Sequence, residues 1–157
     1  MEQNKAKYKL ICENRKARHE FFFLETFEAG IELQGTEVKS LRAGKANLQD
    51  AFCKVENGEM LLYNMHVSPY EQGNRYNHQP KRPRRLLLHK TEILRLYAKV
   101  REKGLTIIPV KCYFSGSLVK VEIALAQGKK LYDKREDMLN KAVKRDTERT
   151  LKERERG

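Results

Sequence analysis

The sequence predicts a mostly β domain with flanking helices, closed or partly closed into an antiparallel barrel. Its 157 residues suit one domain. From Tyr8 to about Ala126, short apolar runs are separated by turn residues, as is typical of a β domain. No strand–helix–strand unit repeats. Closure removes exposed strand edges and therefore favours a barrel, while a β-sandwich remains the alternative because its strand pattern is similar.

The expected strands are short segments of apolar or alternating residues. In the last of them, Val119, Val121 and Ile123 alternate with residues that can face the other side, which indicates a half-buried strand. In chain order the expected strands are Tyr8–Cys12, Glu20–Glu28, Ile31–Gln34, Ala51–Glu56, Met60–Val67, Leu105–Phe114 and Leu118–Leu125.

Two tight turns are predicted between neighbouring strands. Asn57 and Gly58 both accept a positive φ, so this pair predicts a hairpin. The segment Ser115–Ser117 predicts a second hairpin in the same way, joining the last two strands.

Two helices are expected. The shorter spans Thr36–Ala43 and lies between Gly35 and Gly44. The longer spans Glu92–Lys103, with Thr91 as the expected N-cap and Gly104 at the C-terminal end. Apolar side chains share one face of the longer helix, which is therefore expected to cap the sheet.

The chain is strongly basic. It has 33 Lys and Arg against 21 Asp and Glu, a formal net charge of +12. An excess of this size attracts polyanions, so the expected partners are RNA, DNA or an anionic membrane surface. No apolar run is long enough to cross a bilayer and no signal peptide is recognisable, which predicts a soluble cytoplasmic protein.

Cysteine and histidine usage gives no sign of a metal site, a cofactor or catalysis. The three cysteines, Cys12, Cys53 and Cys112, lie far apart in apolar stretches and are expected to be buried free thiols. The four histidines are scattered, and no phosphate-binding glycine loop is present. The chain is therefore not expected to be an enzyme; a nuclease that uses His19 or His66 is the alternative from another class.

Three basic clusters are candidates for RNA contact. The first, Lys81–Arg85, includes Arg84 and Arg85 and ends a long polar segment, Tyr70–Arg85, which is expected to be a loop. Tyrosines and His78 in that segment could stack on bases. The second cluster is Asn14–Glu20, which contains His19. The third is Gly35–Asn47, whose charged residues are Lys39, Arg42 and Lys45.

The last 30 residues differ from the rest in composition. From Gly128 onward there are 11 Lys or Arg and 7 Asp or Glu, with little apolar material. Such a segment cannot build a core, so we expect residues 1–127 to form the domain and residues 128–157 to form a tail. The tail is expected to be disordered alone and helical when bound to a polyanion.

Several phrases of the sequence resemble the SsrA-binding protein (small protein B) family. They are Arg15–Phe21, Phe27–Asn47, Gly128–Lys130 and Asp133–Arg135. The likeness covers nearly the whole chain in the same order.

The resemblance implies a small β-barrel of the oligonucleotide-binding type that binds transfer-messenger RNA and rescues stalled bacterial ribosomes. It implies that Glu28, Leu87 and Lys120 hold the elbow of the RNA's tRNA-like domain, with His19 and the basic clusters in support. The domain would stand where a tRNA has its anticodon arm.

The resemblance also assigns a role to the tail. The residues implied to approach the decoding centre of the ribosome, with its 16S rRNA, are Gly128, Lys129, Lys130, Tyr132, Asp133, Lys134 and Arg135. The rest of the tail would form a helix in the empty mRNA channel. Tyr132 stands where many family members carry histidine, so a stacking ring is kept while a charged imidazole is not.

Further partners are implied through the RNA, namely alanyl-tRNA synthetase and elongation factor Tu, and the protein is expected to be a monomer. A general structured-RNA-binding or ribosomal protein remains the alternative, because charge and a barrel would serve it equally well.

Overall fold

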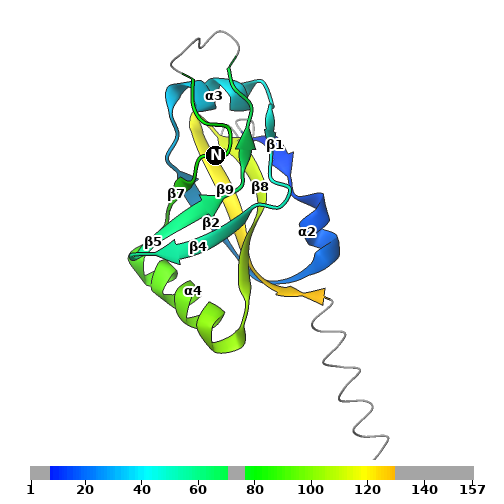
Figure 1. Cartoon of the computed structure of the whole chain (residues 1–157), viewed down its shortest axis with the longest axis vertical. Coiled ribbons are helices and arrows are strands. Elements are labelled where there is room, and N and C mark those ends of the chain that lie inside the picture. The colour runs from blue at the N-terminus through cyan, green and yellow to red at the C-terminus, as the bar shows by residue number, and fades with distance from the viewer. Residues whose placement is uncertain (1–7, 71–76, 130–157) are drawn as a thin grey trace, which may run out of the picture.

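The computed structural model describes residues 8–70 and 77–129, which form a β-barrel with flanking helices (Figure 1). The helices are α2 (Arg15–Glu20), α3 (Gly35–Arg42) and α4 (Lys90–Lys103). The strands are β1 (Tyr8–Glu13), β2 (Phe21–Ile31), β3 (Ala46–Asn47), β4 (Phe52–Glu56), β5 (Glu59–Tyr63), β6 (His66–Val67), β7 (Arg84–Leu87), β8 (Thr106–Ser115) and β9 (Leu118–Gly128).

The strands form a hydrogen-bonded antiparallel ring in the order β8-β4-β5-β7-β2-β9, and β9 pairs with β8 to complete it. β1 adds to the outer edge of β8. Two neighbouring strand pairs of the ring are joined over a short length. β4 and β8 share one register pair, Cys53 with Ile107, and β2 and β7 share two. The predicted mostly β, partly closed barrel is therefore confirmed.

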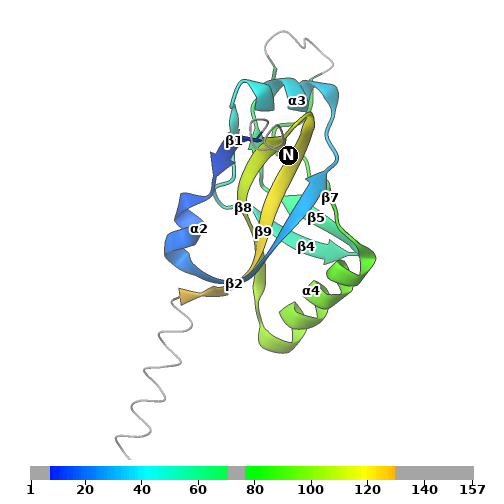
Figure 2. The same cartoon turned by 180° about the vertical axis from the view of Figure 1, so that it is seen from behind.

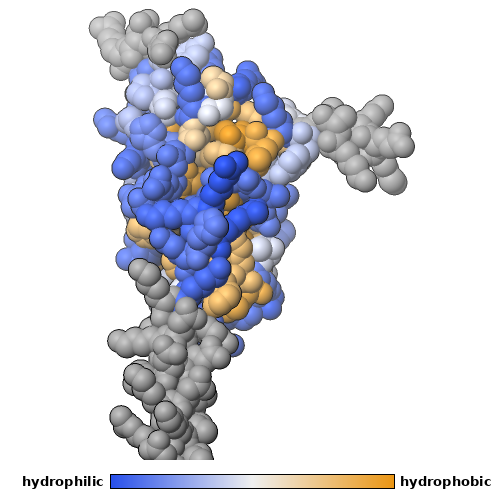
Figure 3. All heavy atoms as spheres, turned by 90° about the vertical axis from the view of Figure 1, so that its right-hand side faces the viewer, coloured by the Kyte–Doolittle hydropathy of each residue, from blue (hydrophilic) through white to orange (hydrophobic). Residues whose placement is uncertain are grey.

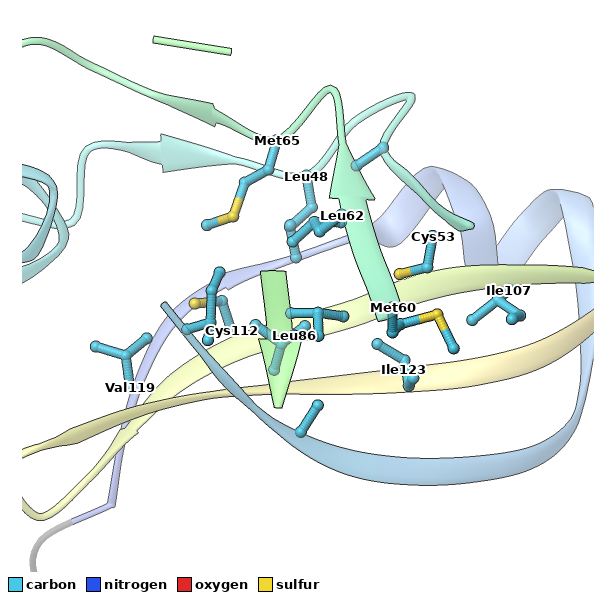
Figure 4. Packing of buried hydrophobic residues seen from close by; sticks show 14 of the residues in the cluster. Leu48, Cys53, Met60, Leu62, Met65, Leu86, Ile107, Cys112, Val119 and Ile123 are labelled. Carbon is cyan, nitrogen blue, oxygen red and sulfur yellow. The ribbon is translucent and has the colours of Figure 1, made fainter. Parts of the chain in front are cut away.

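The core fills the inside of the ring. Met60 and Leu62 from β5 point inward to meet Leu86 from β7 and Ile123 from β9, as Figure 4 shows, and all four are almost fully buried. Met60, Leu62 and Leu86 alternate along their strands with more exposed residues. The outer face of the ring carries polar and charged side chains together with some exposed apolar ones such as Leu87.

α4 covers one end of the barrel and α3 lies at the other (Figure 1). Ile93 and Leu96 of α4 are buried in the core. The N-cap of α4 is His89 and not the predicted Thr91. The Glu92 carboxylate accepts a hydrogen bond from the His89 N–H at 3.4 Å. The predicted end of the helix is confirmed by Gly104, which has a φ of 62°.

Both predicted hairpins are present. Asn57 and Gly58 have φ values of 52° and 78°, so a bulkier residue without their tolerance of this region would be strained here. Gly116, with a φ of 63°, joins β8 to β9.

Two of the predicted strand assignments are wrong. Glu20–Glu28 and Ile31–Gln34 were expected as separate strands, but one strand, β2, continues to Ile31 and residues 32–34 form no strand. The strand expected over Met60–Val67 ends at Tyr63, because Asn64 takes a φ of 64°. The short β6 follows separately.

Three elements were not anticipated, one of them the short strand β3 (Ala46–Asn47) within the third basic cluster. α2 occupies the basic cluster Asn14–Glu20, and the Asn14 side chain caps it by accepting the Ala17 N–H at 3.2 Å. β7 begins at the end of the expected loop Tyr70–Arg85, so Arg84 and Arg85 belong to a strand.

The cysteines in the described part of the chain are free, as predicted. Cys53 and Cys112 are buried, and burial raises the pKa of the Cys53 thiol. Cys12 is only partly buried and lies opposite Cys112 between β1 and β8.

Candidate nucleic-acid interface

The outer face of β7, β2, β9 and β8 brings together residues that are far apart in the sequence. Gly30 of β2 lies opposite Leu87 of β7 on one side and Lys120 of β9 on the other. Lys120 in turn lies opposite Tyr113 of β8. β2, β9 and β8 run side by side in Figure 2. One cross-strand row thus links four strands.

A hollow of about 470 Å³ opens on this face. Glu28, Leu87 and Lys120, the residues implied by the family resemblance to hold RNA, all line it. Leu87 is 47% exposed, so its apolar side chain is available for contact. The remaining lining residues are Gly30, Gly58, Glu59, Arg85, Leu86, Leu88, His89, Glu92 and Ile93.

The absence of a side chain at Gly30 shapes the hollow. A Cβ added there would lie 3.3 Å from the Leu87 Cβ, which is a tight contact. The glycine therefore lets the Leu87 side chain close over β2. Its conformation is ordinary, so space rather than backbone strain favours glycine here.

The charges in the hollow are mixed. Arg85 lies 3.4 Å from a Glu32 carboxylate oxygen and 3.7 Å from one of Glu59. Lys120 can neutralise a phosphate, Glu28 can accept hydrogen bonds from base N–H groups or a ribose hydroxyl, and Leu87 can pack on a base or sugar. Such a site suits a folded RNA with exposed sugar and base edges better than a bare phosphate chain.

Glu28 is held from within the protein. The Tyr113 hydroxyl donates a hydrogen bond to Glu28 Oε2. Burial and this hydrogen bond raise the pKa of Tyr113, so the hydroxyl stays protonated and remains a donor. Tyr113 was not among the predicted site residues, although the hairpin at Gly116 fixes its register with Lys120.

Arg84 is not part of this surface, which corrects its assignment as an RNA contact. Its side chain is fully buried and its Nε donates to Glu37 Oε2. Nη1 donates to the Met65 carbonyl at 2.7 Å and Nη2 to the Pro80 carbonyl at 3.1 Å. Arg84 instead fixes β7 to α3 and to the chain before β7.

Arg82 completes this buried charge cluster with a 2.5 Å contact to Glu37 Oε1. Burial by itself would raise the pKa of Glu37, but the hydrogen bonds from Arg82 and from the Gln34 N–H, together with the Arg84 charge, lower it. Glu37 therefore stays ionised and joins α3 to the strand that carries Leu87.

His78 also has a structural place, so the idea that it stacks on bases is wrong. The ring is buried, 2.9 Å from the Thr36 hydroxyl and 2.9 Å from the Val67 carbonyl. Tyr70 is described, and Lys39 Nζ lies 5.4 Å from the centroid of its ring. The rest of the aromatic segment, residues 71–76, lies outside the described residues.

The other predicted cations are exposed but separate from the hollow. Lys39 and Arg42 lie on α3, and Lys45 follows it. His19 lies at the end of α2, beside the start of β2. Phe21 and Gly30 are nine residues apart on β2, about 30 Å at roughly 3.3 Å per residue. His19 can thus reach only a different part of a ligand that fills the hollow.

The base of the predicted tail starts beside His19. Gly128 pairs with Phe21, and Lys129 Nζ donates to the Arg18 carbonyl at 3.2 Å and lies 5.2 Å from the centroid of the Phe22 ring.

On the face seen in Figure 3, hydrophilic residues predominate and hydrophobic ones form patches between them. Lys130, Tyr132, Asp133, Lys134 and Arg135 lie outside the described residues.

Over residues 8–70 and 77–129, no group of three or more His, Cys, Asp or Glu side chains is placed to hold a metal ion. No helix in the same part of the chain is long and apolar enough to cross a membrane.

Comparisons with known proteins agree on one family. The model of the family described as "SmpB protein" matches residues 11–153. A protein named SsrA-binding protein from Pelotomaculum thermopropionicum is 66% identical over 148 residues, covering 94% of this chain and 97% of its own. One of the same name from Desulforamulus reducens is 67% identical over 150 residues, covering 95% and 93%.

A solved structure described as "tmRNA-SmpB: a journey to the center of the bacterial ribosome" contains a similar chain. It is 53% identical, with a TM-score of 0.64, and the match covers 75% of this chain and 83% of that one. These relatives are named for a binding partner and not for a reaction.

Proposed function

The chain belongs to the SmpB protein family, and from this premise we propose that it binds transfer-messenger RNA through the hollow formed by β7, β2 and β9. The relatives are named SsrA-binding proteins, and the similar solved chain is described together with tmRNA and the bacterial ribosome. The protein acts by binding, and its partners are this RNA and the ribosome.

One observation carries the assignment to this face. Glu28, Leu87 and Lys120 come from three parts of the chain and line one hollow. They lie on adjacent strands, and Gly30 of β2 lies between Leu87 and Lys120. A strand face fixed by a barrel holds its side chains at constant spacing, which suits recognition of a folded RNA by shape. The site therefore favours the tRNA-like domain over unstructured RNA.

Each of the three side chains has a distinct task in this proposal. Lys120 neutralises a phosphate and positions the backbone. Leu87 packs against a sugar or base, because this contact removes its exposed apolar side chain from water. Glu28, held by Tyr113, accepts hydrogen bonds from a base edge or a ribose hydroxyl, which gives preference for RNA shape.

The barrel and the tail have separate roles in the same proposal. The barrel takes the place of an anticodon arm and delivers the RNA to stalled ribosomes for trans-translation. Gly128 and Lys129, which end the described chain beside α2, start the segment that reaches the decoding centre. Lys130, Tyr132, Asp133, Lys134 and Arg135 continue this segment at the decoding centre with its 16S rRNA, and the rest of the tail follows the empty mRNA channel as a helix. Alanyl-tRNA synthetase and elongation factor Tu are further partners in this proposal, reached through the RNA.

The basic residues outside the hollow extend the RNA contact. Lys39, Arg42 and Lys45 of the α3 region are exposed, and Arg85 of β7, which lines the hollow itself, is a further exposed cation. They add sequence-independent attraction to phosphates near the site, whereas His19 contacts the RNA or the ribosome about 30 Å away along β2.

Competition binding tests the function. The protein is mixed with a labelled tRNA-like domain and challenged with unlabelled copies of it or with unrelated folded RNA of equal length. We expect the unrelated RNA to compete at least tenfold less well. Equal competition would favour a general structured-RNA-binding protein instead.

A further inference from the structure

A second hollow of about 340 Å³ adjoins the first on the same face of the barrel. Glu28 lines both hollows, so the carboxylate stands at their common boundary. The other lining residues are Tyr8, Thr26, Phe27, Lys111, Tyr113, Ser115 and Glu122. They come from β1, β2, β8 and β9.

Two tyrosine rings form one wall of this second hollow. The Tyr8 and Tyr113 ring centroids are 4.8 Å apart, and the ring planes are inclined by 37°. Tyr113 is almost buried and its hydroxyl is engaged by Glu28, whereas Tyr8 is 46% exposed at the edge of the sheet. Tyr8 therefore offers an exposed ring that is backed by a fixed one, with Lys111 Nζ 5.6 Å from the Tyr8 ring centroid.

The charges of the second hollow disfavour phosphate. Its carboxylates, Glu28 and Glu122, outnumber its one lysine. Lys111 Nζ lies 3.4 Å from Glu122 Oε2 and also 5.6 Å and 5.7 Å from the two tyrosine ring centroids. Its charge is thus shared among groups of the protein. Carboxylates beside aromatic rings instead suit a base, whose N–H groups donate to them.

We propose that this second hollow holds an unpaired nucleobase of the bound RNA, stacked on Tyr8 with its N–H edge toward Glu28 and Glu122. Tyr113 acts as a positioning residue, because its hydroxyl fixes Glu28 for both hollows. The proposal rests on the proposed function, since the base belongs to the RNA that fills the first hollow.

Substitutions at two tyrosines separate stacking from positioning. Tyr8→Ala removes the exposed ring, and because base–aromatic stacking contributes about 1–3 kcal/mol, we expect affinity for the tRNA-like domain to fall about tenfold. Tyr8→Phe keeps the ring and should restore wild-type affinity. Tyr113→Phe keeps its ring but frees Glu28, and should weaken binding several-fold.

The salt dependence of binding distinguishes this role from a loss of charge. Removing a stacking ring leaves the slope of log K against log salt unchanged, whereas removing a phosphate contact at Lys120 lowers the slope by about one. Tyr97→Ala is the matched control, because Tyr97 is a tyrosine of similar exposure, 41%, on α4. It should bind as the wild type does.

The two possible failures are distinguishable. If Tyr8→Ala is folded by circular dichroism and binds within about twofold of wild type while Lys120→Ala is weakened, the nucleobase subsite is wrong and the function stands. If neither substitution weakens binding, the proposed RNA surface itself is wrong. If Tyr8→Ala does not fold, the wild-type protein is cross-linked photochemically to the tRNA-like domain and its peptides are analysed. RNA attached to the peptide that contains Tyr8 supports the subsite, and its absence from that peptide contradicts it.

Discussion

The Tyr113 hydroxyl donates a hydrogen bond to Glu28 across the intervening strand β9, and so joins two residues 85 positions apart. Glu28 is thereby held at the boundary of two hollows on one face. The same face carries Leu87 and Lys120 in register with Gly30. A rigid, mixed-charge surface of this kind suits recognition by shape more than by charge alone.

Substitution of Gly30 by valine should weaken RNA binding. The added side chain would meet Leu87, whose Cβ lies only 3.3 Å from the site of a Cβ at residue 30. Leu87 must then move, and the first hollow narrows. We expect a fall in affinity of about tenfold, roughly 1.4 kcal/mol, in a titration with the tRNA-like domain. Gly35→Ala, at a site with nothing within 4 Å, is the control and should bind normally.

Replacing Glu37 by glutamine should destabilise the fold strongly. The change leaves the fully buried Arg84 without its counter-charge. Loss of one partner of a buried pair costs about 3–5 kcal/mol. Urea unfolding measures it, with Glu32→Gln as control, because the exposed Glu32–Arg85 pair should contribute no more than about 1 kcal/mol. Equal losses in the two variants would contradict the structural role of Glu37.

Acid should remove the contribution of Glu37 to stability. Its pKa in the folded protein is below its ordinary value: burial acts to raise it and is outweighed by Arg82, Gln34 and Arg84. The contribution is therefore complete above the unfolded pKa, about 4.3, and is lost as the pH falls through the folded pKa. The difference in unfolding free energy between wild type and Glu37→Gln should shrink as the pH falls below about 4. A constant difference would show that Glu37 does not titrate in this way.

Removal of residues 130–157 should separate RNA binding from ribosome rescue. The truncated chain keeps Lys129 and its contact with Arg18, and keeps both hollows. Affinity for the tRNA-like domain should stay near that of the full chain, while rescue of ribosomes stalled on truncated message should stop in a reconstituted translation assay. Loss of RNA binding in the truncated chain would contradict the division of roles.

Local signals in the sequence were sufficient for the turns and for α4. Asn57 and Gly58 are suited to a positive φ whatever surrounds them, and Gly104 ends its helix in the same way. α2 was missed because six residues are too few to show a helical period, and the remaining signal was the cap at Asn14. β7 was missed because its two arginines continue the polar segment Tyr70–Arg85, whose composition is typical of a loop.

The site depended on contacts that no local pattern contains. The burial of Arg84 follows from Glu37, which is 47 residues away. Glu28, Leu87 and Lys120 were selected by family resemblance, and only closure of the ring places them around one hollow. Tyr113 was missed for the same reason, since its partner lies two strands away in the sheet.

The most direct test of RNA binding by this face compares charge reversal at two strand lysines. Lys120→Glu changes a lysine that lines the first hollow, whereas Lys54→Glu makes the same change in net charge at an exposed lysine on β4, outside both hollows. Affinity for the tRNA-like domain is measured over a range of salt concentrations. We expect Lys120→Glu to bind at least tenfold more weakly, with a reduced salt slope, and Lys54→Glu to bind nearly as the wild type does. Equal losses in both variants would mean that the RNA is attracted by net charge and that the face around Gly30 is not its binding site.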